Sequence, residues 1–237
     1  MKSKNMSGTE VSESGFTCEF CTKQFKRDST LISHVCVYKH RWHDKDNHGN
    51  RVGFHAWLQF YAKNSMGKKI RTYENFIKNA YYTAFVKFGQ YCVDINALNV
   101  SRFTDWLLNE KVKIDNWCKD SVYNKYLCEY LRIEDAYDAI ARSIETTIIL
   151  AQEVNIQGND YIRYGNVNKI CHSITTGKIS PWLLYMSDSG NAFLAELSED
   201  LVRMIADYIN VELWAIKFKR GPDVANQIKQ LLAAGGF

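Results

Sequence analysis

The chain has 237 residues, 46% of them hydrophobic and 14% aromatic, which is enough for a sizeable core in one small module plus a larger domain. Only 2 prolines and 13 glycines occur, so few positions force a helix to stop, and we expect a mainly α fold. The formal net charge of +4 is too small to identify a partner by itself, and because no run of about 18 apolar residues occurs, no membrane span is expected.

The first residues and the cysteines indicate the cellular environment. Residues 1–14 are polar and serine-rich without an apolar stretch, so we expect a disordered tail and no secretory signal. Seven cysteines occur, and those beyond the first two show no pairing pattern. This usage favours a reducing, intracellular and cytoplasmic setting over a disulfide framework.

Residues 15–42 contain the spacing of a structural zinc site. Two residues separate Cys18 from Cys21, twelve separate Cys21 from His34, and five separate His34 from His40. Thiolate and imidazole are the ligands that Zn²⁺ prefers in tetrahedral sites. With Phe16, Phe25 and Leu31 at fixed hydrophobic positions, the segment resembles the C2H2 zinc-finger family.

The resemblance implies a small ββα fold that holds one structural Zn²⁺. The two cysteines would lie on a hairpin knuckle, and a helix beginning near Asp28 would carry both histidines. Phe16, Phe25 and Leu31 would form a small core beneath the metal, whose binding would supply the folding free energy. His40 fits the family spacing as fourth ligand, and Cys36 and His43 are alternatives within reach of a different helix end.

The same resemblance implies contacts with nucleic acid. Helix positions −1, 3 and 6 of a DNA-reading finger correspond to Arg27, Thr30 and Ser33, and arginine is well suited to a bidentate contact with guanine. One finger covers about three base pairs, so it would be an accessory grip. Phosphate contacts are expected from further basic residues nearby: Lys39, Arg41, Lys68, Lys69 and Arg71.

The charge distribution favours an anionic partner for the N-terminal half. Residues 15–114 hold sixteen Lys and Arg against eight Asp and Glu, whereas residues 115–160 hold nine acids against four bases. Nucleic acid, DNA more than RNA, is the expected partner. Solvated helix faces are an equally ordinary source of such charges.

The rest of the chain predicts an all-α domain over residues 54–237, joined to the finger by a polar linker at 43–53. Helical spacing of apolar residues is strong in several segments. The expected helices lie at about 54–64, 73–91, 101–109, 120–132, 134–154, 166–175, 181–186, 191–208, 211–218 and 221–233.

Two longer stretches suggest a source. Residues 81–108, YYTAFVKFGQYCVDINALNVSRFTDWLL, and 177–198, GKISPWLLYMSDSGNAFLAELS, resemble proteins of T4-like and marine tailed phages. This resemblance carries no biochemical role and implies only a protein that acts in the cytoplasm of an infected bacterial cell.

No motif in the body requires an enzyme. Glycine-rich phosphate loops, metalloprotease, hydrolase, kinase and deaminase signatures do not occur. We therefore predict a zinc-binding accessory protein of nucleic acid. One alternative is a DNA-modifying or repair enzyme with a helical catalytic body, which requires a cleft gathering several of Asp105, Glu110, Glu196 and Glu199. Another is a structural or protein-interaction role.

Overall fold

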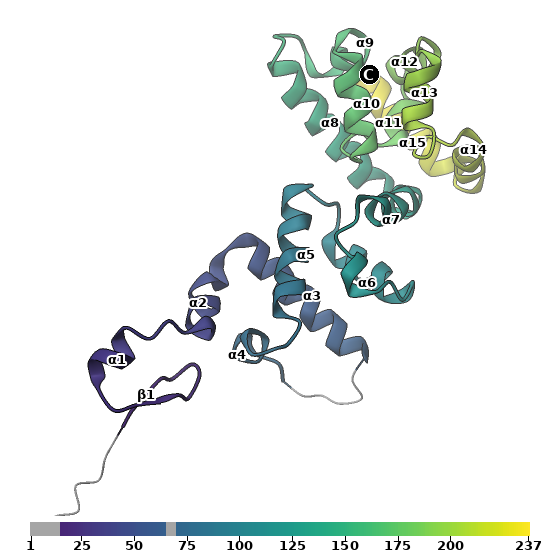
Figure 1. Cartoon of the computed structure of the whole chain (residues 1–237). Helices are drawn as coiled ribbons and strands as arrows, with labels where there is room; N and C mark the ends of the chain where they lie inside the picture. Colours follow the sequence, from purple (N-terminus) through teal and green to yellow (C-terminus); the bar gives the residue numbers. More distant parts are fainter. Residues whose placement is uncertain (1–14, 65–69) are drawn as a thin grey trace, which may run out of the picture. The chain divides into compact units, whose positions relative to one another are not determined.

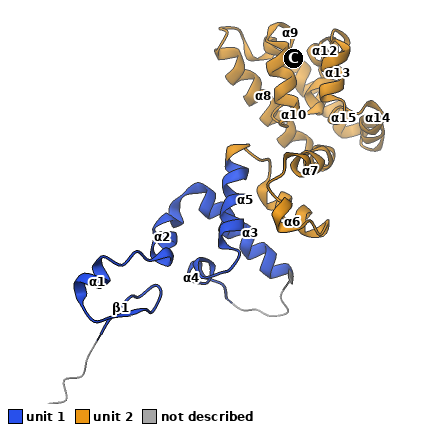
Figure 2. Cartoon of the chain, viewed as in Figure 1, with its two compact units in different colours: residues 1–93 blue, residues 94–237 orange. Residues whose placement is uncertain are grey.

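The computed structural model describes residues 15–64 and 70–237. The fold is mainly α, with 71% helix. The chain forms two compact units, residues 1–93 and 94–237 (Figures 1 and 2). In the described residues the sheet structure is limited to one short N-terminal hairpin. The predicted fold class, mainly α with a small N-terminal hairpin, is confirmed. The division after Val93 falls within the stretch expected as one helical domain.

The first unit opens with the hairpin. Strand β1, Phe16–Thr17, pairs antiparallel with β2, Gln24–Phe25, so that Phe16 lies opposite Phe25. Two short helices follow, α1 at Asp28–Ile32 and α2 at Val37–His43. The expected single finger helix is therefore two helices, with residues 33–36 non-helical between them.

The predicted linker at 43–53 is wrong, because every residue in it except Asn47 is helical. The 3-10 turn η1 spans Asp44–Asp46, and α3 runs over His48–Asn64. Polar composition and two glycines indicated a loop, but these glycines serve a helix contact instead.

Gly49 and Gly53 lie on the face of α3 that meets α5, Tyr82–Asp94, at backbone distance. A Cβ placed on Gly89 of α5 would be 2.0 Å from the Gly49 carbonyl oxygen and 2.5 Å from the Gly53 nitrogen. Helix residues four apart share one face. The spacing thus lets two helices approach more closely than side chains would permit.

The expected long helix over 73–91 is also wrong, because the chain forms α4, Tyr73–Ile77, and then α5. The Asn79 side chain accepts a hydrogen bond from the Tyr81 backbone amide at 2.9 Å. Such local bonds compete with the helix ladder, which explains the break. Aromatic rings from α3, α4 and α5 fill the core between them: Phe54, Trp57, Phe60, Phe76 and Phe85.

The second unit is entirely helical, and α8 packs against α9, α11 and α15. Its α-helices are α6 Val100–Asn109, α7 Asp120–Ile133, α8 Ala136–Gln152, α9 Tyr161–Tyr164, α10 Val167–Thr175, α11 Pro181–Met186, α12 Asp188–Ala195, α13 Glu199–Ile205, α14 Val211–Arg220 and α15 Pro222–Ala234. Short 3-10 turns, η2 at Ile114–Asn116 and η3 at Gly158–Asp160, connect them. Large side chains such as Trp117, Leu127 and Leu131 are fully buried here.

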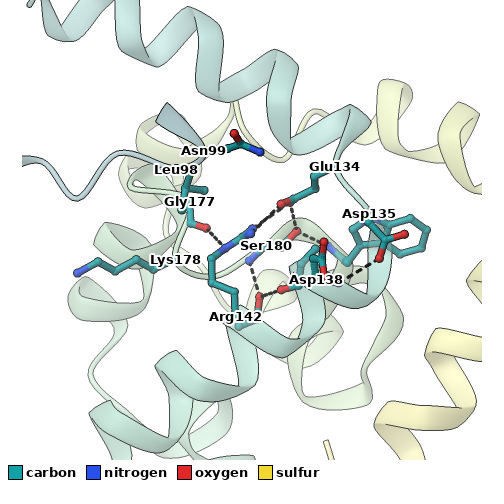
Figure 3. Close-up of polar contacts among 12 residues, drawn as sticks. Leu98, Asn99, Glu134, Asp135, Asp138, Arg142, Gly177, Lys178 and Ser180 are labelled. Atoms are coloured by element: carbon teal, nitrogen blue, oxygen red, sulfur yellow. Dashed lines mark hydrogen bonds and ion pairs between the residues drawn. The ribbon is translucent and has the colours of Figure 1, made fainter. Parts of the chain in front are cut away.

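A largely buried ion pair links the end of α7 to α8 (Figure 3). The Arg142 guanidinium meets the Glu134 carboxylate in bidentate fashion at 2.7 and 2.9 Å, and its Nε donates to the Gly177 carbonyl at 2.8 Å. The Ser180 hydroxyl donates to the same carboxylate at 3.2 Å. Burial raises the pKa of Glu134, and Arg142 and Ser180 offset part of that rise. The network joins α8 to the loop before α11.

Candidate metal centre

Four side chains of the N-terminal module converge on one point. The sulfurs of Cys18, Cys21 and Cys36 and a ring nitrogen of His34 all lie within 4.8 Å of one another. Sulfur at about 2.3 Å and nitrogen at about 2.0 Å from one tetrahedral zinc are about 3.5 Å apart. The separation of 3.3 Å between Cys21 Sγ and His34 Nε2 fits that geometry. The group could hold one metal ion, and its donor set suits zinc.

A tight knuckle presents the first two sulfurs. The Cys18 amide donates to the Lys23 carbonyl at 2.9 Å, and the Thr22 amide donates to the Cys18 carbonyl at 2.8 Å. Thr22 has a φ of 60°, a costly conformation for a β-branched residue. The turn thereby bends enough to bring Cys18 and Cys21 together, as the two-residue spacing predicted.

The fourth position differs from the expected one. Helix α1 ends at Ile32, and Cys36 follows in extended conformation as the residue that precedes α2. His40 lies one turn into α2, exposed and outside the group of four. His43, the other alternative, is likewise outside it. A histidine ligand six residues beyond His34 requires a continuous helix, and the break at 33–36 presents Cys36 instead.

The imidazole of His34 is held by an aromatic neighbour. Its ring lies 4.8 Å from the Phe25 ring, centroid to centroid, at an interplanar angle of 44°. Phe25 comes from β2, so the hairpin itself orients the ligand that follows α1. This packing directs Nε2 toward the Cys21 sulfur.

The predicted apolar core beneath the metal is not buried. Phe16 is 42% exposed, and Phe25 and Leu31 are only half-buried. Among residues 15–36, which we call the metal module, Cys18 and Cys36 are the hydrophobic residues that are buried, at 4% and 3% exposure. So little apolar burial does not stabilise a domain of this size.

Backbone amides of the knuckle affect the pKa values of the cysteine thiols. The Cys21 backbone amide lowers the pKa of the Cys18 thiol, although burial acts in the opposite direction. For Cys21, the Lys23 amide favours the thiolate, but burial and the nearby Cys18 and Cys36 sulfurs outweigh it and raise the pKa. A cation among the sulfurs favours their deprotonated forms.

The predicted nucleic-acid contacts fall into different environments. Arg27, Thr30 and Lys39 are exposed, and Ser33 is exposed just beyond the end of α1. Arg41 is engaged within the protein: its guanidinium lies 4.3 Å from the Tyr82 ring centroid, and its Nη1 donates to the Ile77 carbonyl at 2.6 Å.

Arg71 and Lys217 also lie against aromatic rings. The Arg71 guanidinium lies 5.2 Å from the Tyr61 ring centroid, and Lys68 and Lys69 lie outside the described residues. Within the second unit, the Lys217 ammonium lies 5.1 Å from the Trp182 ring centroid, and burial lowers its pKa.

The candidate catalytic carboxylates do not form a comparable group. Among the described residues, the Cys/His cluster is the group of His, Cys, Asp and Glu whose ligand atoms converge, and it includes none of Asp105, Glu110, Glu196 and Glu199. Glu199 instead pairs with Arg203 at 3.1 Å on an exposed face of α13. No described helix combines the length and apolarity that crossing a membrane requires.

Sequence reasoning missed the Glu134–Arg142 pair because neither residue belongs to a recognisable motif.

Comparisons of the chain with models of protein families, with curated proteins and with solved structures find no match. The role of the metal module therefore has to be inferred from its own residues and geometry.

Proposed function

We propose that this protein binds one structural zinc ion and uses the module around it to hold nucleic acid, DNA in preference to RNA, as an accessory grip. The observation that carries the proposal is a Cys₃His group in a module with no buried apolar core, surrounded by exposed cations. The ion would order a surface that could not otherwise hold its shape.

The charge of this surface favours phosphate. Lys23, Lys26, Arg27 and Lys39 are all exposed, against the acids Glu19 and Asp28. Three thiolates and one Zn²⁺ would leave the site with a single negative charge on half-buried and buried ligands. The four cations exceed the two acids and this site charge by one, and exposed lysine and arginine supply most of the affinity for a nucleic-acid backbone.

The geometry supports phosphate binding more than base reading. Helix α1 has five residues, a rise of about 7.5 Å, and Ser33 lies past its end. Arg27 stands directly before the helix and is the side chain of the expected trio best suited to a base edge. We therefore expect the module to bind nucleic acid with low sequence specificity.

The test measures retention of a fluorescent DNA duplex by the zinc-loaded full chain as a function of salt. We expect Arg27→Ala with Lys39→Ala to weaken binding about tenfold near 0.1 M salt and to reduce the slope of log K against log salt by about 2. The matched control removes two exposed charges from the second unit, Lys219→Ala with Arg220→Ala.

Three results would contradict the proposal: undiminished binding by the Arg27/Lys39 variant, an equal loss in the control variant, or DNA binding that persists after the zinc is removed. RNA of the same sequence serves as competitor, and stronger competition by RNA than by DNA would reverse the stated preference.

A further inference from the structure

A small pocket lies within the first unit between the knuckle and the helices that follow it. It has a volume of ≈350 Å³. Glu19 and Phe20 of the knuckle line one side, Trp42 of α2 lines another, and α4 with its C-cap contributes the rest: Glu74, Ile77 and Lys78. Neither the metal group nor the exposed cations of the proposed grip account for this pocket.

The inner surface of the pocket is aromatic and apolar. The Phe20 and Trp42 rings have centroids 6.4 Å apart and are inclined at 50°, so they form an open wedge instead of a closed stack. Ile77, which is 1% exposed, also lines the pocket. Both rings are half-buried, which leaves part of each accessible from the pocket.

Two carboxylates that form no ion pair among the described residues line the pocket beside this aromatic wedge. Glu19 and Glu74 are exposed, and within the described residues neither one takes part in an ion pair or a side-chain hydrogen bond. Lys78, also exposed, lines the pocket without pairing with either. Phosphate is unfavourable between two carboxylates, so this pocket does not belong to a nucleic-acid backbone.

Aromatic faces beside carboxylates favour a cation. The same unit already uses its rings in this way, because Lys45 Nζ lies 4.8 Å from the Trp42 ring centroid and the Arg41 guanidinium lies 4.3 Å from that of Tyr82. A guanidinium is planar, stacks on aromatic rings and donates two parallel hydrogen bonds to a carboxylate. An ammonium offers only a compact charge.

From this geometry we propose that the pocket binds an arginine side chain of a partner protein, stacked against the Phe20 and Trp42 wedge and bonded to Glu19 and Glu74. The pocket uses side chains other than the cations of the nucleic-acid grip, although Glu19 and Phe20 also line a neighbouring pocket with Lys39. The protein would then bind two macromolecules, one basic and one anionic.

The probe is N-acetyl-arginine amide, titrated into the zinc-loaded full chain and followed by NMR at the indole N–H of Trp42, which a Trp42→Phe variant assigns. The neutral isostere N-acetyl-citrulline amide is the matched ligand. We expect a saturable shift with the arginine amide and at least about tenfold weaker binding of the citrulline amide.

Protein variants separate the carboxylates from general effects. Glu19→Gln with Glu74→Gln should weaken arginine-amide binding about tenfold, Lys78→Ala should strengthen it, and Glu110→Gln in the second unit should leave it unchanged. The double variant should retain DNA at least as well as the natural protein. Equal shifts with both amides, no saturable shift, or an unchanged Glu19/Glu74 variant would overturn the proposal without affecting the nucleic-acid grip.

Discussion

The metal module and the helical unit of residues 94–237 differ sharply in how much apolar surface they bury. In the module, two cysteines are the buried hydrophobic residues and the predicted core stays accessible to water. In the helical unit, Trp117, Leu127 and Leu131 are completely enclosed. A segment of about 20 residues with so little apolar burial would need ligand bonds to a metal to maintain its shape, whereas the longer unit has an apolar core.

Removing the metal tests this contrast most severely. A Cys36→Ser change, or chelation, should remove a binding free energy on the order of 10 kcal/mol and unfold the module, because its apolar burial is too small to replace it. Zinc content should fall from one per chain, and hydrogen exchange over residues 15–36 should become unprotected. Protection over 94–237 should persist. Acid should act in the same direction, since protons displace zinc from thiolates as the pH falls.

His40→Ala is the control, because His40 lies outside the group of four. It should retain one zinc per chain and full exchange protection of the module. Loss of zinc on His40→Ala, with retention on Cys36→Ser, would return the fourth position to the histidine.

Gly89→Ala tests packing in the part of the first unit that depends on burial. Alanine favours a helix over glycine by about 1 kcal/mol, but its Cβ would lie 2.0 Å from the Gly49 carbonyl oxygen. The clash should push α3 and α5 apart and lower the free energy of unfolding of this unit by a net of about 3 kcal/mol. Hydrogen exchange in urea measures this change. Gly221→Ala, with no atom within 4 Å of its added Cβ, should change stability by about 0.5 kcal/mol or less.

Arg142→Ala tests the buried ion pair with a smaller expected effect. It leaves the Glu134 carboxylate, whose side chain is 1% exposed, without its cation. Unfolding free energy should fall by about 2 kcal/mol at pH 8. Because burial raises the pKa of Glu134 in the folded state, its protonation stabilises the fold, so the loss should shrink as the pH is lowered toward the unfolded value near 4.5.

The exposed pair of Arg203 with Glu199 supplies the control for this change. Arg203→Ala should alter stability by about 0.5 kcal/mol or less and without the same dependence on pH, because solvent screens that pair. A loss in Arg142→Ala that stays constant between pH 5 and pH 8 would show that Glu134 does not respond to burial.

The predictable features were those that local chemistry determines. Cys18, Cys21 and His34 meet because two-residue and twelve-residue gaps suit a knuckle followed by a helix, and apolar periodicity identified most helices. Cys36 could be offered only as an alternative, because the break after α1 depends on how α2 packs against α4.

The missed features depend on contacts between distant residues. Gly49 and Gly53 read as loop residues because their partner, Gly89, lies far along the chain. Arg41 read as a phosphate contact because its neighbours Ile77 and Tyr82 come together only in the folded unit. Spacing along a sequence does not reveal such pairs.

Cys36 has a position with a wider consequence, since it is both a candidate ligand and the residue from which α2 begins. Helix α2 is held to α4 through Arg41, whose carbonyl also accepts a hydrogen bond from Tyr73. A metal bound by Cys36 would restrain the N-cap residue of α2, and any coupling between metal affinity and the docking of α2 would act equally in both directions. A partner that shifts α2 would then change the affinity of the site for the metal.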